Sequence, residues 1–146
     1  MESSFDARIR CAVARPIAKP AAEVYAALAR ADRYGDWWPR QVGFETMEGP
    51  LGVGSRIVLR AFGYSSTMEV VRIQPGKSIW FRFISGAYKG TTEWILEPAE
   101  GGTRVVYQLR VEPVPRWLEF LSRFINLGRL HSLWADKALE DLEKKL

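Results

Sequence analysis

The chain has 146 residues, of which 26% are charged, and its net charge is +4 at pH 7. This length predicts one domain over residues 1–146 that folds around a single core. Basic and acidic residues are interspersed rather than gathered into a stripe, so we expect no nucleic-acid partner.

Cysteine usage and hydropathy exclude several further classes. Cys11 is the only cysteine, so no internal disulfide can form, and no Cys/His cluster has metal-ligand spacing. We therefore expect no metal and no cofactor. Charged residues interrupt the N-terminus before a secretory apolar region could form, and no apolar run approaches the ~18 residues that span a bilayer. We expect a cytoplasmic protein without an integral membrane segment.

The first predicted elements are one strand and two short helices. Residues 5–13 alternate in polarity, which predicts a half-buried strand. Its apolar face comprises Phe5, Ala7, Ile9, Cys11 and Val13. Pro20 suits the first turn of a helix that runs to about residue 30. A second short helix over residues 33–39 contains Trp37 and Trp38 and is closed by Pro39.

Six strand-like runs follow between residues 42 and 111. Turn chemistry separates them, as at residues 74–77 (QPGK), where proline and glycine fit a type II turn. No intervening helix is long enough for a parallel crossover, so the runs predict an antiparallel meander. The glycine-rich residues 49–54 match no phosphate-binding fingerprint. Residues 114–146 predict one long helix with a possible kink at Gly128.

Alternation along the strands predicts which side chains face the concave side of the sheet. The inward set is Leu59, Phe81, Phe83, Trp94, Leu96, Val105, Tyr107 and Leu109. The outward set is Arg60, Arg82, Glu93, Arg104 and Arg110. Glu69 faces inward if its strand keeps the register of Val71 and Ile73, and outward if one bulge intervenes.

Two apolar stripes run along the predicted C-terminal helix. The first comprises Phe120, Phe124, Leu127, His131, Trp134 and Ala138 and suits the concave side of the sheet. His131, the only histidine, either orients or activates a ligand there or is a core histidine bonded to a nearby hydroxyl or carbonyl. The second stripe comprises Leu130, Leu133, Leu139 and Leu142. Either the first two helices or a partner subunit covers it, so a homodimer is possible.

The element order and five short motifs resemble the helix-grip fold of the SRPBCC superfamily. The motifs are residues 18–25 (AKPAAEVY), 37–39 (WWP), 53–54 (VG), 71–75 (VRIQP) and 102–105 (GTRV). The superfamily includes START lipid-transfer domains, the major birch-pollen allergen and proteins labelled polyketide cyclase or dehydrase. The resemblance implies an α+β fold in which a seven-stranded curved antiparallel sheet wraps a long C-terminal helix, with two short helices between the first two strands.

A cavity is expected from geometry as well. Seven strands make a sheet roughly 30 Å wide, whereas one helix is only about 10 Å across. The sheet must therefore curl around the helix and leave a pocket lined by apolar side chains. We expect the ligand-binding residues to be Trp38, Leu59, Phe81, Phe83, Tyr88, Trp94, Tyr107, Trp117, Phe124, Leu127, His131 and Trp134.

Three functions are consistent with the sequence. The first is binding or transport of a small hydrophobic ligand, such as a lipid, quinone, polyketide or aromatic compound. The second, implied by the resemblance, is a metal-free cyclase, dehydratase or hydrolase that uses His131 as acid or base, with Tyr88 or Tyr107 polarising a carbonyl. The third is a protein-interaction module with a vestigial cavity. Trp117 is either a hinge anchor or a gate.

Overall fold

The computed structural model describes residues 8–61 and 63–146. Within these residues the strands are β1 (Ile9–Ile17), β2 (Gly43–Thr46), β3 (Arg56–Ala61), β4 (Tyr64–Gln74), β5 (Ser78–Ser85), β6 (Tyr88–Ala99) and β7 (Gly102–Pro113). The helices are α1 (Ala21–Leu28), the 3₁₀ helix η2 (Ala31–Asp36), α2 (Arg116–Leu121) and α3 (Leu127–Lys145).

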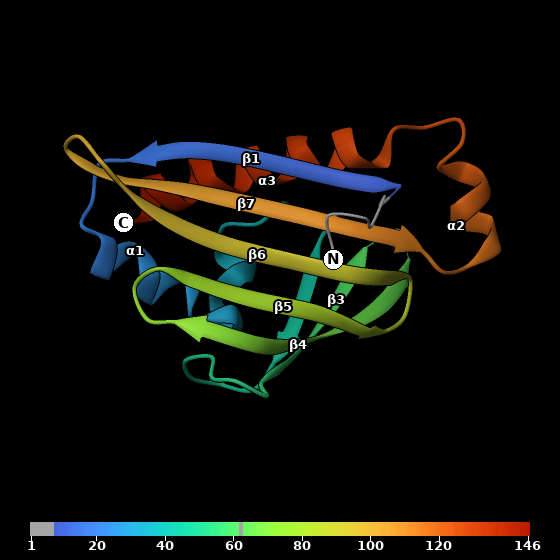
Figure 1. Ribbon diagram of the computed structural model, residues 1–146, viewed down its shortest axis with the longest axis horizontal. Helices are drawn as coiled ribbons and strands as arrows, with labels where there is room; N and C mark the ends of the chain where they lie inside the picture. The colour runs from blue at the N-terminus through green and yellow to red at the C-terminus, as the bar shows by residue number, and fades with distance from the viewer. Residues whose placement is uncertain (1–7, 62) are drawn as a thin grey trace.

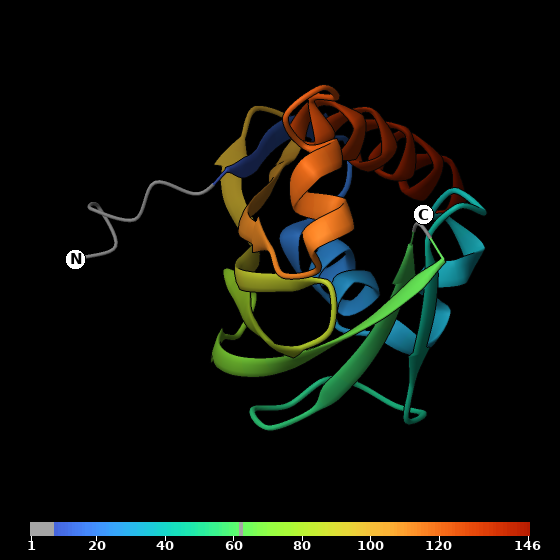
Figure 2. The ribbon, with the colours of Figure 1, turned by 90° about the vertical axis from the view of Figure 1, so that its right-hand side faces the viewer.

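The strands form one antiparallel sheet in the order β1-β7-β6-β5-β4-β3-β2. The chain is thus a meander whose first strand pairs with its last. The sheet curls into a trough that holds α1, and α3 runs along the edge made by β1 (Figures 1 and 2). The predicted helix-grip fold, with two short helices between the first two strands, is confirmed.

Strand β1 begins within the predicted segment and extends beyond it. Ile9 and Cys11 are buried as the alternation predicts, while Phe5 and Ala7 lie outside the described residues. The strand continues to Ile17 through Pro16. A proline is tolerated here because β1 lies at the edge of the sheet, where one row of backbone groups has no neighbouring strand.

A β-bulge in β4 decides the orientation of Glu69. Met68 and Val70 are buried, so Glu69 between them points to the outer face, opposite Arg56 and Arg82 on the neighbouring strands. The pairing with β5 shifts between Val70 and Arg72, so Val71 is the extra, unpaired residue. The inward and outward positions of β4 exchange at this bulge. The cavity therefore lacks this carboxylate.

The expectation of one helix over residues 114–146 is wrong. The helix is interrupted at residues 122–126, and Asn126 caps the new start of α3 by accepting a hydrogen bond from the Arg129 backbone N–H at 3.0 Å. The interruption turns α2 out of line with α3. Phe120 and Phe124, which were predicted to face the sheet, are 59% and 74% exposed.

Gly128, the predicted kink, instead allows close packing between α3 and β1. An added Cβ there would lie 2.1 Å from the backbone oxygen of Arg10. We expect Gly128→Ala to lower the free energy of unfolding by about 1–3 kcal/mol, because backbone atoms of two packed elements must separate. Urea unfolding of the purified variant measures this change.

Gly52→Ala is the matched control, since nothing lies within 4 Å of an added Cβ at Gly52. The control should shift stability by less than about 0.5 kcal/mol. Equal effects of the two substitutions would contradict the close approach of α3 to β1.

Candidate functional site

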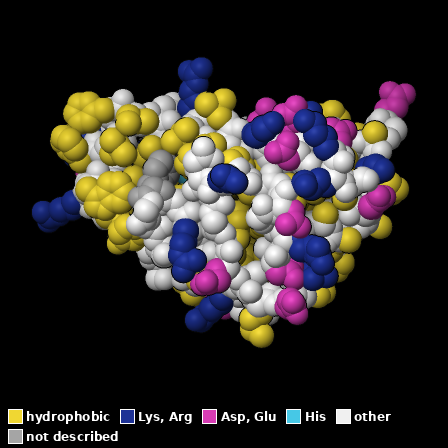
Figure 3. All heavy atoms as spheres, turned by 180° about the vertical axis from the view of Figure 1, so that it is seen from behind, with side chains coloured by type: hydrophobic (Ala, Val, Ile, Leu, Met, Phe, Trp, Pro, Cys, Tyr) yellow, Lys and Arg dark blue, Asp and Glu magenta, His cyan; other side chains and the backbone are white. Residues whose placement is uncertain are grey.

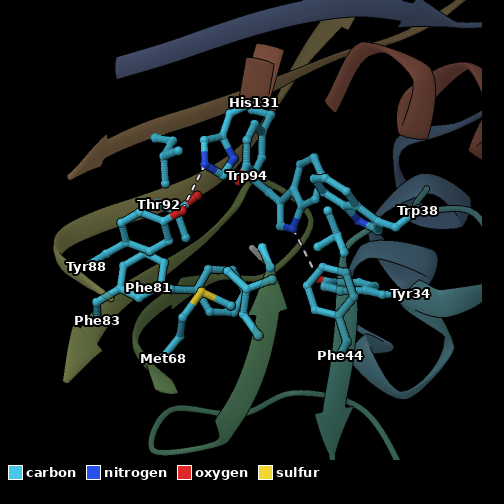
Figure 4. Close-up of a pocket in the computed structure, with 15 residues that line it drawn as sticks. Tyr34, Trp38, Phe44, Met68, Phe81, Phe83, Tyr88, Thr92, Trp94 and His131 are labelled. Atoms are coloured by element: carbon cyan, nitrogen blue, oxygen red, sulfur yellow. Dashed lines mark hydrogen bonds between the residues drawn. The ribbon is translucent and has the colours of Figure 1, made fainter. Parts of the chain in front are cut away.

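An apolar cavity lies between the curved sheet and the helices. It encloses about 30 Å³. The lining residues are Tyr34, Trp38, Val42, Phe44, Leu59, Ala61, Met68, Phe81, Phe83, Tyr88, Thr92, Trp94, Tyr107, Leu109 and His131. Most of these are aromatic, and their rings converge from η2, the sheet strands and α3 (Figure 4).

The cavity is small although the sheet is much wider than one helix. Aromatic side chains from η2 and the residues after it enter the trough and occupy the space that the helices leave. The Trp38 ring lies 5.7 Å from the Tyr107 ring and 5.5 Å from the Phe44 ring, measured between centroids. The remaining space holds about one water molecule.

Three indoles form a cluster beside the cavity. Trp37 lies 5.9 Å from Trp38 and 5.9 Å from Trp94, and Trp38 lies 6.2 Å from Trp94, between ring centroids. Trp37 is buried, whereas Trp38 is partly exposed and lines the cavity. The two adjacent tryptophans thus have different places: Trp37 anchors η2, and Trp38 borders the cavity.

A hydrogen-bonded relay fixes the wall formed by η2. The Trp94 indole N–H donates to Tyr34 Oη at 3.1 Å (Figure 4). Tyr34 Oη in turn donates to the backbone oxygen of Leu28 at 2.5 Å. Burial raises the pKa of Tyr34, so its hydroxyl stays protonated and keeps donating. The relay connects β6, η2 and the end of α1.

The polar groups at the other side of the cavity are Tyr88 and His131. Tyr88 Oη lies 3.2 Å from His131 Nε2, and both side chains are buried (Figure 4). Burial lowers the pKa of His131 to about 4 and raises the pKa of Tyr88. Both groups are therefore neutral at pH 7. One group donates and the other accepts, according to the imidazole tautomer.

One polar atom in the wall is unsatisfied. The Trp38 indole Nε1 is buried and has no hydrogen-bond partner among the described residues. An unpaired buried N–H is costly, so such atoms are rare in folded proteins. This donor is available to a ligand acceptor or to water if the ring moves.

The structure brings together eight of the predicted ligand-binding residues around the cavity: Trp38, Leu59, Phe81, Phe83, Tyr88, Trp94, Tyr107 and His131. Four others lie elsewhere. Trp117 and Phe124 are 45% and 74% exposed because the helix is interrupted before α3. Leu127 is buried in the core outside the cavity, and Trp134 lies outside the lining with its ring centroid 5.6 Å from that of His131.

Several lining residues were missed by sequence reasoning: Tyr34, Val42, Phe44, Ala61, Met68 and Thr92. Met68 and Thr92 could have been found by extending the alternation through β4 and β6. Tyr34 gave no usable signal, since a six-residue 3₁₀ helix has too few turns to display a stripe. Leu109 lines the cavity and was predicted to face inward.

Two kinds of feature are absent from the part of the chain that the structure describes. Residues 8–61 and 63–146 contain no group of three or more His, Cys, Asp or Glu side chains arranged to hold a metal ion. Over the same residues, none of the helices combines the length and apolar character needed to span a bilayer.

A sequence model of the family described as polyketide cyclase / dehydrase and lipid transport matches residues 8–146. The chain belongs to this family. With its fold, this membership places it in the SRPBCC superfamily. The family's description includes both enzymes and lipid carriers, so membership supports ligand binding or cyclase-like roles without naming a substrate. No curated protein matches the sequence.

Solved structures show the same fold as this polyketide cyclase-like chain. TTHA0849 from Thermus thermophilus is 20% identical with a TM-score of 0.72, over 92% of this chain and 94% of that one. Ginseng major latex-like protein 151 from Panax ginseng is 15% identical with a TM-score of 0.68, over 93% and 95%. The Aha1 dimer from Colwellia psychrerythraea is 19% identical with a TM-score of 0.60, over 93% and 98%.

The buried imidazole gives stability a defined pH dependence. His131 in the unfolded chain takes up a proton near its ordinary pKa of 6.5, whereas the folded chain does so only near pH 4. The unfolded state thus binds more protons in this window, and the free energy of unfolding falls as the pH falls through it. We expect a loss of about 3 kcal/mol from this residue, complete near pH 4.

His131→Gln should remove this contribution. Urea unfolding between about pH 7 and about pH 5 should give a steeper loss of stability for the wild type than for the variant, before most carboxylates titrate. Parallel pH profiles for the two proteins would show that the imidazole is not held neutral in the core.

Proposed function

We propose that this chain binds a small hydrophobic molecule in the aromatic cavity between the curved sheet and the helices. The observation that carries this proposal is an apolar, mostly aromatic lining with one buried polar pair, Tyr88 and His131. Ligand pockets commonly combine apolar walls with a few oriented polar groups. Ring-rich walls favour a planar aromatic or quinone-like molecule over a flexible acyl chain.

Admission of such a ligand requires Trp38 to move, since the cavity of about 30 Å³ is too small for any organic molecule. Trp38 is partly exposed, follows η2 and makes no side-chain hydrogen bond through Nε1 among the described residues. Rotation of its ring therefore breaks packing contacts but no hydrogen bond. The same motion offers the indole N–H to an acceptor on the ligand.

The electrostatics support binding better than catalysis. An acid–base catalyst works best with a pKa near the operating pH, whereas burial moves the pKa of His131 to about 4. A neutral imidazole and a neutral tyrosine are suited to hold a carbonyl or hydroxyl oxygen. The family description supports a cyclase-like role as the second candidate. In that role Tyr88 and His131 would hydrogen-bond a carbonyl of the bound substrate.

The test begins with native mass spectrometry of the purified chain, followed by solvent extraction of anything retained. A small aromatic or quinone-like compound should be found. In parallel, 1,4-naphthoquinone at a hundred times its dissociation constant should stabilise the chain by about 2.7 kcal/mol in a thermal-shift assay. If nothing is retained and no member of an aromatic panel stabilises the chain, the proposal is wrong.

Tyr88→Phe should weaken 1,4-naphthoquinone binding by about tenfold, because it removes one hydrogen bond to the quinone oxygen. Isothermal titration measures this change. Tyr25→Phe is the matched control, since Tyr25 is a partly buried tyrosine outside the cavity lining. Conversion of a bound compound by the wild type that disappears in His131→Gln would favour the cyclase-like role instead.

A further inference from the structure

The segment that follows the sheet exposes an unusual amount of apolar surface. We define the α2 patch as Tyr64, Val114, Trp117, Phe120, Phe124 and Ile125, whose exposures are 39%, 57%, 45%, 59%, 74% and 46%. Hydrophobic side chains gather at this end of the molecule, where α2 stands out from the sheet (Figures 1 and 3). Contiguous exposed apolar surface of this kind marks an interaction site.

The patch is held in place rather than frayed. Leu118 is fully buried and anchors α2. Trp117 packs against Tyr64 at the start of β4, with 6.1 Å between ring centroids, and Phe120 packs against Phe124 at 5.1 Å. The rings are thus presented outward by a helix whose inner side is fixed.

The segment that carries these rings is basic. Residues 114–129 contain three arginines (116, 123 and 129) and one glutamate, a net charge of +2. The carboxylate of Glu119 is already engaged by Arg8 at 3.6 Å and by Arg123 at 3.2 Å. An open surface hollow lined in part by Arg8, Ser122 and Arg123 adjoins the rings. Aromatic rings beside arginines match the interface of a bilayer that contains anionic lipids.

We propose that the α2 patch docks this chain on the surface of an anionic membrane. A second copy docked through the same patch would add a second set of these arginines to one interface, so the charge favours anionic lipid over self-association. The patch also protrudes, which suits insertion between headgroups. This docking goes beyond the proposed function and holds whatever the cavity binds.

Docking here would place one end of the cavity next to the membrane. Ala87, whose backbone oxygen accepts a hydrogen bond from the Val114 N–H at 2.8 Å, directly precedes Tyr88 of the cavity wall. Ala61, also in the lining, pairs with Tyr64 of the patch across β3 and β4. An apolar molecule dissolved in the bilayer would then lie close to one wall of the cavity.

The experiment is co-sedimentation of the full chain with vesicles of phosphatidylcholine alone and of equal parts phosphatidylcholine and phosphatidylglycerol. We expect binding to the anionic vesicles that weakens as salt is added. Phe120→Ser with Phe124→Ser should lower the partition coefficient at least about tenfold. The matched control is Met47→Ser with Val53→Ser, which removes side chains 86% and 69% exposed in the loop before β3.

A charge variant tests whether the arginines beside the patch contribute to membrane binding. Arg116→Gln with Arg129→Gln should weaken binding to the anionic vesicles by about fivefold for each arginine. The same double change at Arg82 and Arg110, exposed on the outer face of the sheet, should weaken it much less. Brominated lipids should quench part of the wild-type tryptophan emission, and that part should vanish in Trp117→Phe.

Three results would overturn the proposal. They are no binding to the anionic vesicles, an equal loss in the patch and control variants, and a dimer in sedimentation velocity that Phe120→Ser with Phe124→Ser dissociates. The last result would identify a second copy as the occupant of the patch. None of these measurements involves the cavity ligand, so they succeed or fail independently of the proposed function.

Discussion

The structure depends on a mismatch of widths between the sheet and its helical cover. A seven-stranded sheet is roughly 30 Å wide, and α3 covers about 10 Å of it along β1. The sheet must curl, and α1, η2 and a set of aromatic rings must fill the rest. The filling is nearly complete, so only a cavity of about 30 Å³ remains, and Trp38 forms part of its wall.

Burial in this filled trough also determines the chemistry that remains. Removing water raises the pKa of Tyr34 and Tyr88 and lowers that of His131, so each group stays neutral and takes part in hydrogen bonds. Such neutral donors and acceptors can form hydrogen bonds without supplying a charge. The same burial that keeps water out of the trough keeps His131 neutral at pH 7.

The sequence predicts the sheet and its inner face well, because alternation depends only on the period of the strand. Phe81, Trp94 and Leu109 face inward for that reason. It could not fix Glu69, whose direction depends on a one-residue bulge in β4. Nor could it place Phe124, because helical spacing continues in the sequence through residues 122–126 while the backbone does not. A break without glycine or proline leaves little trace in composition.

The three clustered indoles have an optical consequence. Trp37, Trp38 and Trp94 lie about 6 Å apart, so an excitation absorbed by one of them is shared with the others. Their ultraviolet circular dichroism then reports the mutual orientation of three transition dipoles. Displacement of Trp38 alone would alter the spectrum of all three indoles. The tryptophan circular dichroism therefore reports whether Trp38 has moved.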